Sequence, residues 1–267
     1  YCCVWSQTGT PLLDVLQVDA ATGAGTQLYG DMDIFGTAYN QVSAIAPLMA
    51  PVKLPTGQTV PTLVLAGPDG LYALHLDGSG EYAKYTNGLS ANNMIWSNLA
   101  YFAGVMYVGD QTGSVHAVDG TFAPVPGSPY RFTNGIPPLT LAVAPDANGA
   151  AILIAVDETA QLELYFTDGG ISSTLATNQT QIGTMSAVTP EGMIYVGGAS
   201  HAVSSSNLGQ IFGIRTNDLR ELRDFVVESQ LLQDYDPGAV AVARYQTHVT
   251  IVDDNKVIRL PKLRSQR

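Results

Sequence analysis

Charged residues are scarce in this sequence, and basic residues are the scarcer kind. Charged residues make up 13% of the 267 positions, with 12 Lys and Arg against 23 Asp and Glu, so the formal net charge is −11. A surface that binds nucleic acid needs clustered Lys and Arg, and the composition argues against such a partner. Attraction to an anionic membrane is disfavoured for the same reason. Hydrophobic residues reach 46%, which excludes general disorder and is enough for a sizeable core.

Cysteine is almost absent, and its two copies, Cys2 and Cys3, are adjacent. Neighbouring cysteines pair only through a strained ring, so a disulfide that closes a long loop is not expected. Several interpretations stay open: two half-buried thiols in a first strand, a vicinal disulfide, a bond to a partner chain, or a shortened lipoprotein start.

Long apolar runs are missing as well, and none approaches the roughly 18 residues of a membrane span. Residue 1 is Tyr and not Met, so we expect the chain to be processed or to be part of a longer protein. Lys is rare, Ser, Thr and Asn are abundant, and Asn178-Gln179-Thr180 is a glycosylation sequon. These features favour an extracytoplasmic protein (periplasmic, cell-surface or secreted), with Asn178 as the candidate glycosylation site.

The helical period is nearly absent too, and only the stretch from Arg220 to Asp234 has a sequence that suits a helix. Elsewhere, apolar runs of four to eight residues are cut by Gly, Pro, Asn and Asp, which is typical of strands. The runs recur in units of four, which we label strands a to d. Strand c ends at an aspartate in five of the six units, at Asp19, Asp77, Asp119, Asp168 and Asp218.

Four short strands in a period of about 40–50 residues predict a β-propeller blade. The fold class is therefore all-β: a single propeller domain over residues 1–267, with six four-stranded antiparallel blades, or seven if the chain is a fragment. Blade boundaries are expected near residues 42, 92, 136, 182 and 236. The first unit lacks strand a and the last lacks strand d. Either the N-terminal strand completes the last blade, which would cover open sheet edges, or blades are missing.

Residues 69–119 carry a family resemblance. The segment contains GLYALHL, then YTNGLSANN, then VMYVG, and it resembles the propeller repeats of bacterial hybrid two-component sensors. It is also similar to the broader quinoprotein-dehydrogenase-like repeat. The resemblance implies the propeller fold, whereas function carries over less safely. Tyr107 and Tyr195 replace the family's usual Trp, and the tryptophan docking motif of the quinoprotein enzymes is absent.

Candidate site residues are expected on one face of the propeller, where the b-to-c turns meet the d-to-a connections. The candidates are Asn87, Asn92, Asn93, Asp110, Asn134, Asp157, His201, Tyr235 and Asp253. His201 lies in the longest b-to-c loop, and long loops on a rigid scaffold often carry sites. Acids in these turns suit Ca²⁺, which prefers oxygen ligands, but Asp also favours tight turns for backbone reasons alone. His75 and His116 fall in c strands, where a satisfied or solvated role is expected.

No catalytic motif is assembled in the sequence, and no catalytic residue is assigned. The preferred interpretation is a non-catalytic extracytoplasmic module that binds a protein partner, a small ligand or a glycan. No cofactor is expected, with Ca²⁺ as the ion to consider and the metal otherwise unknown. The alternative is a metal-dependent lactonase of the gluconolactonase type, with ligands among Asn87, Asp110, Asn134 and Asp146. A quinone-dependent oxidoreductase is less favoured.

Overall fold

The computed structural model places part of the chain. It describes residues 2–5, 12–19, 21–34, 48–67, 69–89, 97–132, 135, 138–145, 149–157, 162–167, 171–175, 181–185, 193–200, 208–215, 225–226, 239–242, 248–253 and 256–261. Side chains are described within residues 12–132 of these ranges and for some residues up to 167. The chain divides into two compact units, residues 1–129 and 130–267.

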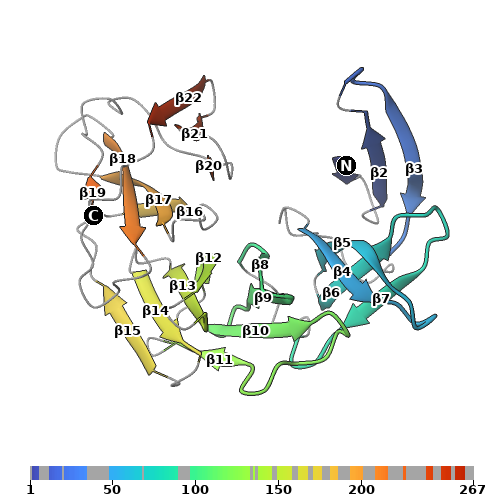
Figure 1. Ribbon diagram of the computed structural model, residues 1–267, viewed down its shortest axis with the longest axis horizontal. Coiled ribbons are helices and arrows are strands. Elements are labelled where there is room, and N and C mark those ends of the chain that lie inside the picture. Colours follow the sequence, from blue (N-terminus) through green and yellow to red (C-terminus); the bar gives the residue numbers. More distant parts are fainter. Residues whose placement is uncertain are drawn as a thin grey trace. The chain divides into compact units, whose positions relative to one another are not determined.

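The described strands form six antiparallel sheets, in which each strand pairs with the next one along the chain (Figure 1). The first three sheets are β1 (Cys2–Trp5), β2 (Leu13–Val18) and β3 (Gly25–Met32); β4 (Leu48–Lys53), β5 (Thr59–Gly67), β6 (Gly70–His75) and β7 (Tyr82–Tyr85); and β8 (Ala100–Phe102), β9 (Val105–Gly109), β10 (Ser114–Asp119) and β11 (Tyr130–Arg131). The architecture is thus all-β and is built from consecutive strands.

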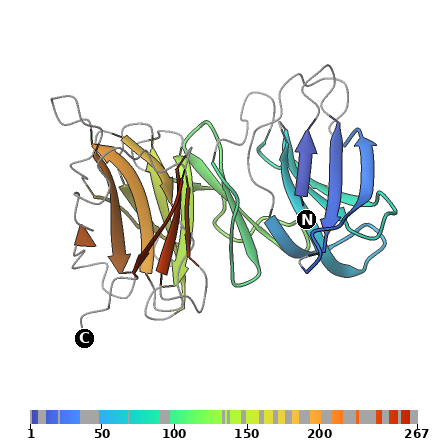
Figure 2. The same cartoon turned by 90° about the horizontal axis from the view of Figure 1, so that it is seen from above.

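The later sheets repeat this pattern, and their strands lie side by side in both views (Figure 1 and Figure 2). They are β12 (Pro138–Pro145), β13 (Ala151–Asp157), β14 (Leu162–Phe166) and β15 (Ile171–Leu175); β16 (Gln181–Met185), β17 (Met193–Ser200), β18 (Leu208–Arg215) and β19 (Phe225–Val226); and β20 (Ala239–Val242), β21 (His248–Asp253) and β22 (Lys256–Pro261). Counting the described strands, four of the six sheets have four strands, and the first and last have three.

The strand assignment from sequence agrees with most of these strands, and the differences lie at first strands. β8 begins at Ala100, whereas the apolar run expected to form it begins at Ile95, and β16 begins at Gln181, before the run expected from Thr184. The run expected from Ser43 leads into β4 at Leu48, and residues 43–47 lie outside the described residues. Hydrophobic runs mark which residues are buried, but pairing with the neighbouring strand sets where a strand begins. In the stretch from Arg220 to Asp234, the described residues Phe225–Val226 are strand and not helix.

β1 pairs with β2, with Cys2 opposite Leu16 and Cys3 opposite Val15. The N-terminal strand therefore acts as strand b of the first sheet. The blade boundaries expected near residues 42, 92, 136, 182 and 236 stay predictions. The number of blades and the single-domain assignment stay predictions.

Turn aspartates explain the recurring end of strand c. Asp19, Asp77 and Asp119 each accept a hydrogen bond from a backbone amide two residues later, at 2.8 Å in all three. A short carboxylate side chain can cap a turn in this way, which is why Asp is favoured there. Asp168 and Asp218 lie outside the described residues.

The second sheet is buried on both faces because its side chains alternate between two cores. The core shared with the third sheet contains Val64, Ala66, Leu71 and Ala73 together with Met106, Val108 and Val118. The core shared with the first sheet contains Leu63, Leu65, Tyr72 and Leu74 together with Leu13, Val15 and Tyr29. Successive residues of a strand point to opposite faces, so one apolar run fills both cores. This packing of sheet against sheet is the arrangement that the sequence predicts.

First strands of consecutive sheets also contact one another. β4 contacts β8 in the first unit, and β16 contacts both β12 and β20 in the second. Within the first unit, the amide of Lys53 at the end of β4 donates a hydrogen bond of 2.6 Å to the carbonyl oxygen of Gly120, beyond β10. The second and third sheets are therefore joined both at their first strands and through a shared core.

Candidate functional site

The turn between β9 and β10 is built around the carboxylate of Asp110. Its Oδ1 atom accepts hydrogen bonds from the Thr112 amide at 2.8 Å, the Thr112 hydroxyl at 2.7 Å and the Ser114 amide at 3.1 Å. Asp119 makes the same three bonds in the next turn, to the Thr121 amide and hydroxyl and to the Ala123 amide. The sequence Asp-x-Thr thus forms the same turn twice in succession.

Asp110 differs from Asp119 because its second oxygen binds a histidine. The Nε2 atom of His116 lies 3.0 Å from Oδ2 of Asp110, and the two side chains are only 2% and 3% exposed. Burial raises the pKa of the Asp110 carboxyl, but hydrogen bonds from His116, Thr112 and Ser114 outweigh burial and hold this pKa below its usual value near 3.8. The carboxylate is therefore ionised and only accepts, so Nε2 of His116 donates.

The ring of His116 packs under the connection that follows β7. A Cβ atom at Gly88 would lie 3.0 Å from Cε1 of His116, and Gly88 has a φ of +76°. The ring also meets the edge of Tyr85, with centroids 6.3 Å apart. Tyr85 and Leu89, on either side of the turn, are buried, and the Leu89 amide donates to the Thr86 carbonyl at 3.0 Å. Asn87 lies at the exposed tip of this anchored turn.

The second unit contains a related connection. Residues 132–135 have the sequence Phe-Thr-Asn-Gly, where residues 85–88 have Tyr-Thr-Asn-Gly. Phe132 is buried, and its ring meets the edge of Tyr165 in β14 with centroids 6.0 Å apart. Gly135 again has a positive φ, +64°, and its amide donates to the Phe132 carbonyl at 3.2 Å. In both connections a buried aromatic residue packs against strand c of the following sheet, which is β10 in the first case and β14 in the second. A glycine with positive φ follows three residues later.

A second acidic turn, between β5 and β6, holds a polar cluster of Asp69, Tyr72 and Lys84. The Tyr72 hydroxyl donates to Oδ1 of Asp69 at 2.6 Å, and Lys84 Nζ lies 2.8 Å from Oδ2. Lys84 Nζ also lies 4.8 Å above the centre of the Tyr72 ring. Burial and the bond to Asp69 raise the pKa of Tyr72 to about 12, and the bonds from Asp69 and Tyr72 overcome burial and raise the pKa of Lys84 to about 12. Neither group is poised to exchange a proton near neutral pH.

The candidate residues predicted from the sequence differ in their exposure, and several lie outside the described residues. Asn87 is exposed, and Asp110 is buried with both of its oxygens engaged. Asp157 and Asp253 end strands β13 and β21, and their side chains are outside the described set, as are those of Cys2 and Cys3. The remaining candidates lie outside the described residues: Asn92, Asn93, Asn134, Asp146, Asn178, His201 and Tyr235.

The sequence did not predict that Asp110 binds His116. It also did not predict that Gly88, after β7, lies directly against the ring of His116. It expected a solvated or satisfied role for His116. In the structure Nε2 of His116 pairs with Asp110, whereas Nδ1 is buried and has no hydrogen-bond partner among the described residues. The missing signal was the spacing: Asp110 in the turn and His116 in the following strand lie on one hairpin, and hairpin geometry brings their side chains together. For a metal-dependent lactonase, Asp110 offers no oxygen that lacks a partner. Across the described residues, no three His, Cys, Asp or Glu side chains gather as metal ligands do.

No protein-family model and no curated protein sequence matches the chain. Solved structures do match. Hydrazine synthase of Kuenenia stuttgartiensis aligns with 93% of this chain and 72% of its own, at 13% identity and a TM-score of 0.59. A structure titled as a complex of KlAtg21 with the coiled-coil of AgAtg16 aligns with 97% and 77%, at 10% identity and a TM-score of 0.61. The Dos1 propeller aligns with 79% and 59%, at 10% identity and a TM-score of 0.55.

Identities this low carry the fold and not the function. Together with the consecutive antiparallel sheets and their contacting first strands, the matches show that the chain has a fold of the β-propeller type. No more particular family is defined by them. Among the described residues, no helix is long and apolar enough to span a membrane.

Proposed function

We propose that this protein is a non-catalytic binding module that acts outside the cytoplasm. Its b-to-c turns and d-to-a connections would present polar side chains to a protein partner. The observation that carries the proposal is the closed Asp110–His116 pair. These are residue types that often perform acid–base catalysis, yet both are almost fully buried and serve to hold a hairpin. Because a substrate cannot reach these buried side chains, they cannot exchange a proton with it.

The connection from Tyr85 to Leu89 supports a binding role. Its two ends are buried, and Gly88 rests on His116, so the position of exposed Asn87 is fixed by the core. A polar side chain held on a rigid turn loses little conformational entropy when it binds. Asn is also well suited to adaptable hydrogen bonding at interfaces. The low Lys content and the abundance of Ser, Thr and Asn support the extracytoplasmic location.

A matched pair of variants tests the proposed face. Asn87→Arg places a long side chain on the proposed binding turn, whereas Gln58→Arg places the same side chain on the exposed β4–β5 turn, at the other end of the strands. Both proteins would be immobilised and incubated with an envelope extract from the source cells. We expect a partner that is retained by the wild type and Gln58→Arg but lost with Asn87→Arg. Equal retention by all three proteins would reject this face as the binding surface.

A further inference from the structure

The turn that follows β7 has the dipeptide Asn87-Gly88 at its exposed tip. In such a dipeptide the backbone nitrogen of glycine attacks the side-chain amide carbon of asparagine, and a five-membered succinimide ring forms. Glycine favours this reaction because it has no Cβ atom to hinder the approach. An exposed Asn-Gly pair is therefore a candidate modification site, and its reactivity depends on the conformation of the turn that contains it.

One hydrogen bond and the two central φ angles define this turn. The Leu89 amide donates to the Thr86 carbonyl oxygen at 3.0 Å, so residues 86–89 form a hydrogen-bonded turn. Gly88, its third residue, has a φ of +76°, whereas Asn87, its second residue, does not have a positive φ. A negative φ followed by a positive one is the pattern of a type II turn.

The type II turn keeps the reacting atoms apart. In this turn ψ of the second residue is about +120°, which places the carbonyl oxygen of Asn87 nearer to its own Cβ atom than the nitrogen of Gly88. Ring closure needs the opposite arrangement, with that nitrogen nearly eclipsed with Cβ. Because a peptide group is planar, the whole group between the two residues must rotate first. The turn therefore loses its native geometry before the ring closes.

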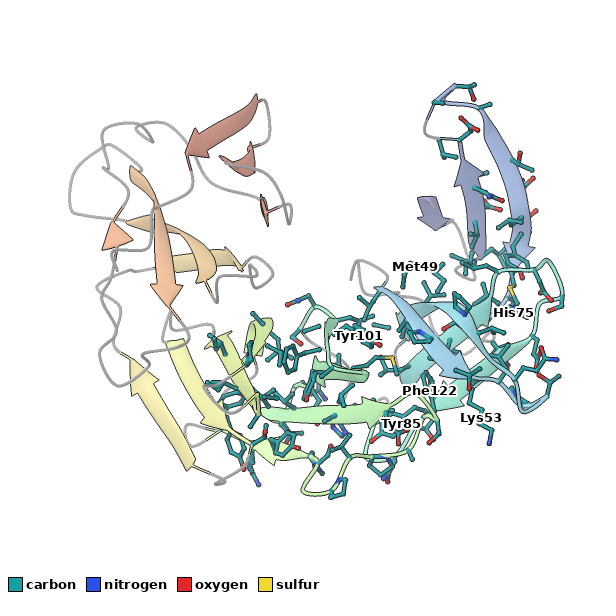
Figure 3. The ribbon with its side chains drawn as sticks, viewed as in Figure 1. Met49, Lys53, His75, Tyr85, Tyr101 and Phe122 are labelled. Atoms are coloured by element: carbon teal, nitrogen blue, oxygen red, sulfur yellow. The ribbon has the colours of Figure 1, made fainter. Side chains whose placement is uncertain are left out.

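Packing holds the turn in this geometry at both ends and at its centre. Tyr85 and Leu89 are 4% and 5% exposed and belong to the core shared by the second and third sheets. The ring of Tyr85 also meets the edge of Phe122, with centroids 6.4 Å apart (Figure 3). Gly88 lies against the ring of His116. Rotation of the peptide group disturbs these contacts, so the reaction requires a local opening of the structure.

We infer that Asn87 is a latent deamidation site, which the native turn keeps closed and which reacts when this turn opens. The Gly88 nitrogen forms a bond to Cγ of Asn87, and the bond between Cγ and Nδ2 breaks. Ammonia leaves with the proton that the Gly88 nitrogen gives up. Water then opens the ring at one of its two carbonyl carbons and yields aspartate or isoaspartate. Water is the only other reactant, and no atom is oxidised or reduced.

Either product changes the turn. Both replace a neutral amide with a carboxylate, on a protein whose formal net charge is already −11. Isoaspartate also lengthens the backbone between Thr86 and Leu89 by one carbon atom. The longer backbone no longer matches the spacing that joins the Thr86–Leu89 hydrogen bond to the contact between Gly88 and His116. This inference goes beyond the proposed binding role and does not depend on it.

Peptide mapping by mass spectrometry, after incubation of the whole chain at mildly alkaline pH, measures the reaction at Asn87. The same incubation in urea gives the rate for the open chain. We expect the folded protein to react at least about tenfold more slowly, since the turn is rarely open. Asn87→Gln is the negative control, because its longer side chain forms a six-membered ring far less readily. Mapping also separates Asn87 from the other Asn-Gly pairs, Asn134-Gly135 and Asn148-Gly149.

Two matched variants separate local opening of the turn from a general loss of stability. Leu89 and Leu63 are 5% and 2% exposed, but Leu89 anchors the turn and Leu63 belongs to the core shared with the first sheet. We expect Leu89→Ala to speed the reaction by at least about tenfold and Leu63→Ala by less than about twofold. Circular dichroism confirms that both variants are folded during the incubation. Leu89→Val, a smaller change, takes the place of Leu89→Ala if that variant unfolds.

Three results would overturn the inference: no reaction of Asn87 in urea, equal rates in urea and in the folded protein, or equal acceleration by Leu89→Ala and Leu63→Ala. The retention experiment with Asn87→Arg tests the binding face separately. A partner that depends on residue 87 would remain established after any of these results, and a deamidation site would remain established if no partner were retained.

Discussion

The imidazole ring of His116 fills the space that a side chain at residue 88 would need. A Cβ atom there would lie 3.0 Å from Cε1 of His116, closer than such carbons ordinarily approach, so the ring would have to shift. The contact joins the connection after β7 to strand β10 of the following sheet. It thereby links the exposed turn at Asn87 to the buried Asp110–His116 pair.

Gly88→Ala should therefore destabilise the protein more than a comparable glycine substitution elsewhere. The variant combines an unfavourable positive φ with a steric clash, and we expect the free energy of unfolding to fall by about 2–4 kcal/mol. Gly104→Ala is the control, since Gly104 has a φ of +85° but no atom within 4 Å of its Cβ position. It should lose only about 1–2 kcal/mol. Urea denaturation of both variants measures the difference, and equal losses would contradict the packing argument.

Comparing the two Asp-x-Thr turns measures how much the Asp110–His116 pair adds to the free energy of unfolding. Asp110→Asn and Asp119→Asn disturb the same turn geometry, but only Asp110 binds a histidine. Removing one partner of a buried pair should lower the free energy of unfolding by about 3 kcal/mol, against about 1 kcal/mol for Asp119→Asn. Chemical denaturation at neutral pH compares them. Losses of the same size would show that the His116 contact contributes nothing beyond the turn.

The Asp110 pair also predicts a dependence of stability on pH. The pKa of Asp110 in the folded protein lies below its usual value near 3.8, so the folded state favours the ionised carboxylate. This contribution is complete above the unfolded-state pKa and is lost as the pH falls through the folded-state pKa. The stability difference between wild type and Asp110→Asn should therefore shrink when the pH is lowered below about 3.8. A difference that stays constant from pH 7 to pH 2.5 would contradict this account.

Tyr29 links the first sheet to the second through its hydroxyl group. The hydroxyl donates a hydrogen bond to the His75 carbonyl oxygen and accepts one from the Gly78 amide at 2.9 Å. Tyr29→Phe should reduce the free energy of unfolding by about 0.5–1.5 kcal/mol, because two backbone groups at a partly buried position lose their hydrogen-bond partner. Tyr101→Phe, at an exposed position, should change it by less than about 0.5 kcal/mol. Faster hydrogen exchange of the Gly78 amide in Tyr29→Phe would locate the effect.

Tyrosine absorbance tests the cluster of Asp69, Tyr72 and Lys84. The pKa of Tyr72 is raised to about 12, by burial and by its hydrogen bond to Asp69, while Lys84 acts in the opposite direction. Asp69→Asn should therefore lower the pKa of Tyr72, and Lys84→Met should raise it. Difference titrations against Tyr72→Phe, with circular dichroism to confirm folding at each pH, isolate this side chain. Identical titration curves in both variants would contradict the assigned contacts.

The sequence predicts most of the strands because each one alternates or continues as an apolar run between turn residues. It also predicts Asp at the ends of c strands, since that preference is local. It does not predict that Asp110 is a buried partner of His116, because turn chemistry and ligand binding favour the same residue at the same place. Nor does it predict that Met49 is exposed while Ala50 is buried. That difference depends on what packs against each face of β4, and no local pattern records it.

Successive side chains of the second sheet point to two different cores, and this determines which mutations the sheet tolerates. Leu63 and Val64 are neighbours in the chain, yet their side chains belong to separate cores. Replacing both should give the sum of the individual effects, as if the two sites were remote. Deleting a single residue from β5 would instead exchange the contents of both cores at once. In this sheet, substitutions accumulate independently on its two sides, while insertions and deletions are confined to the turns.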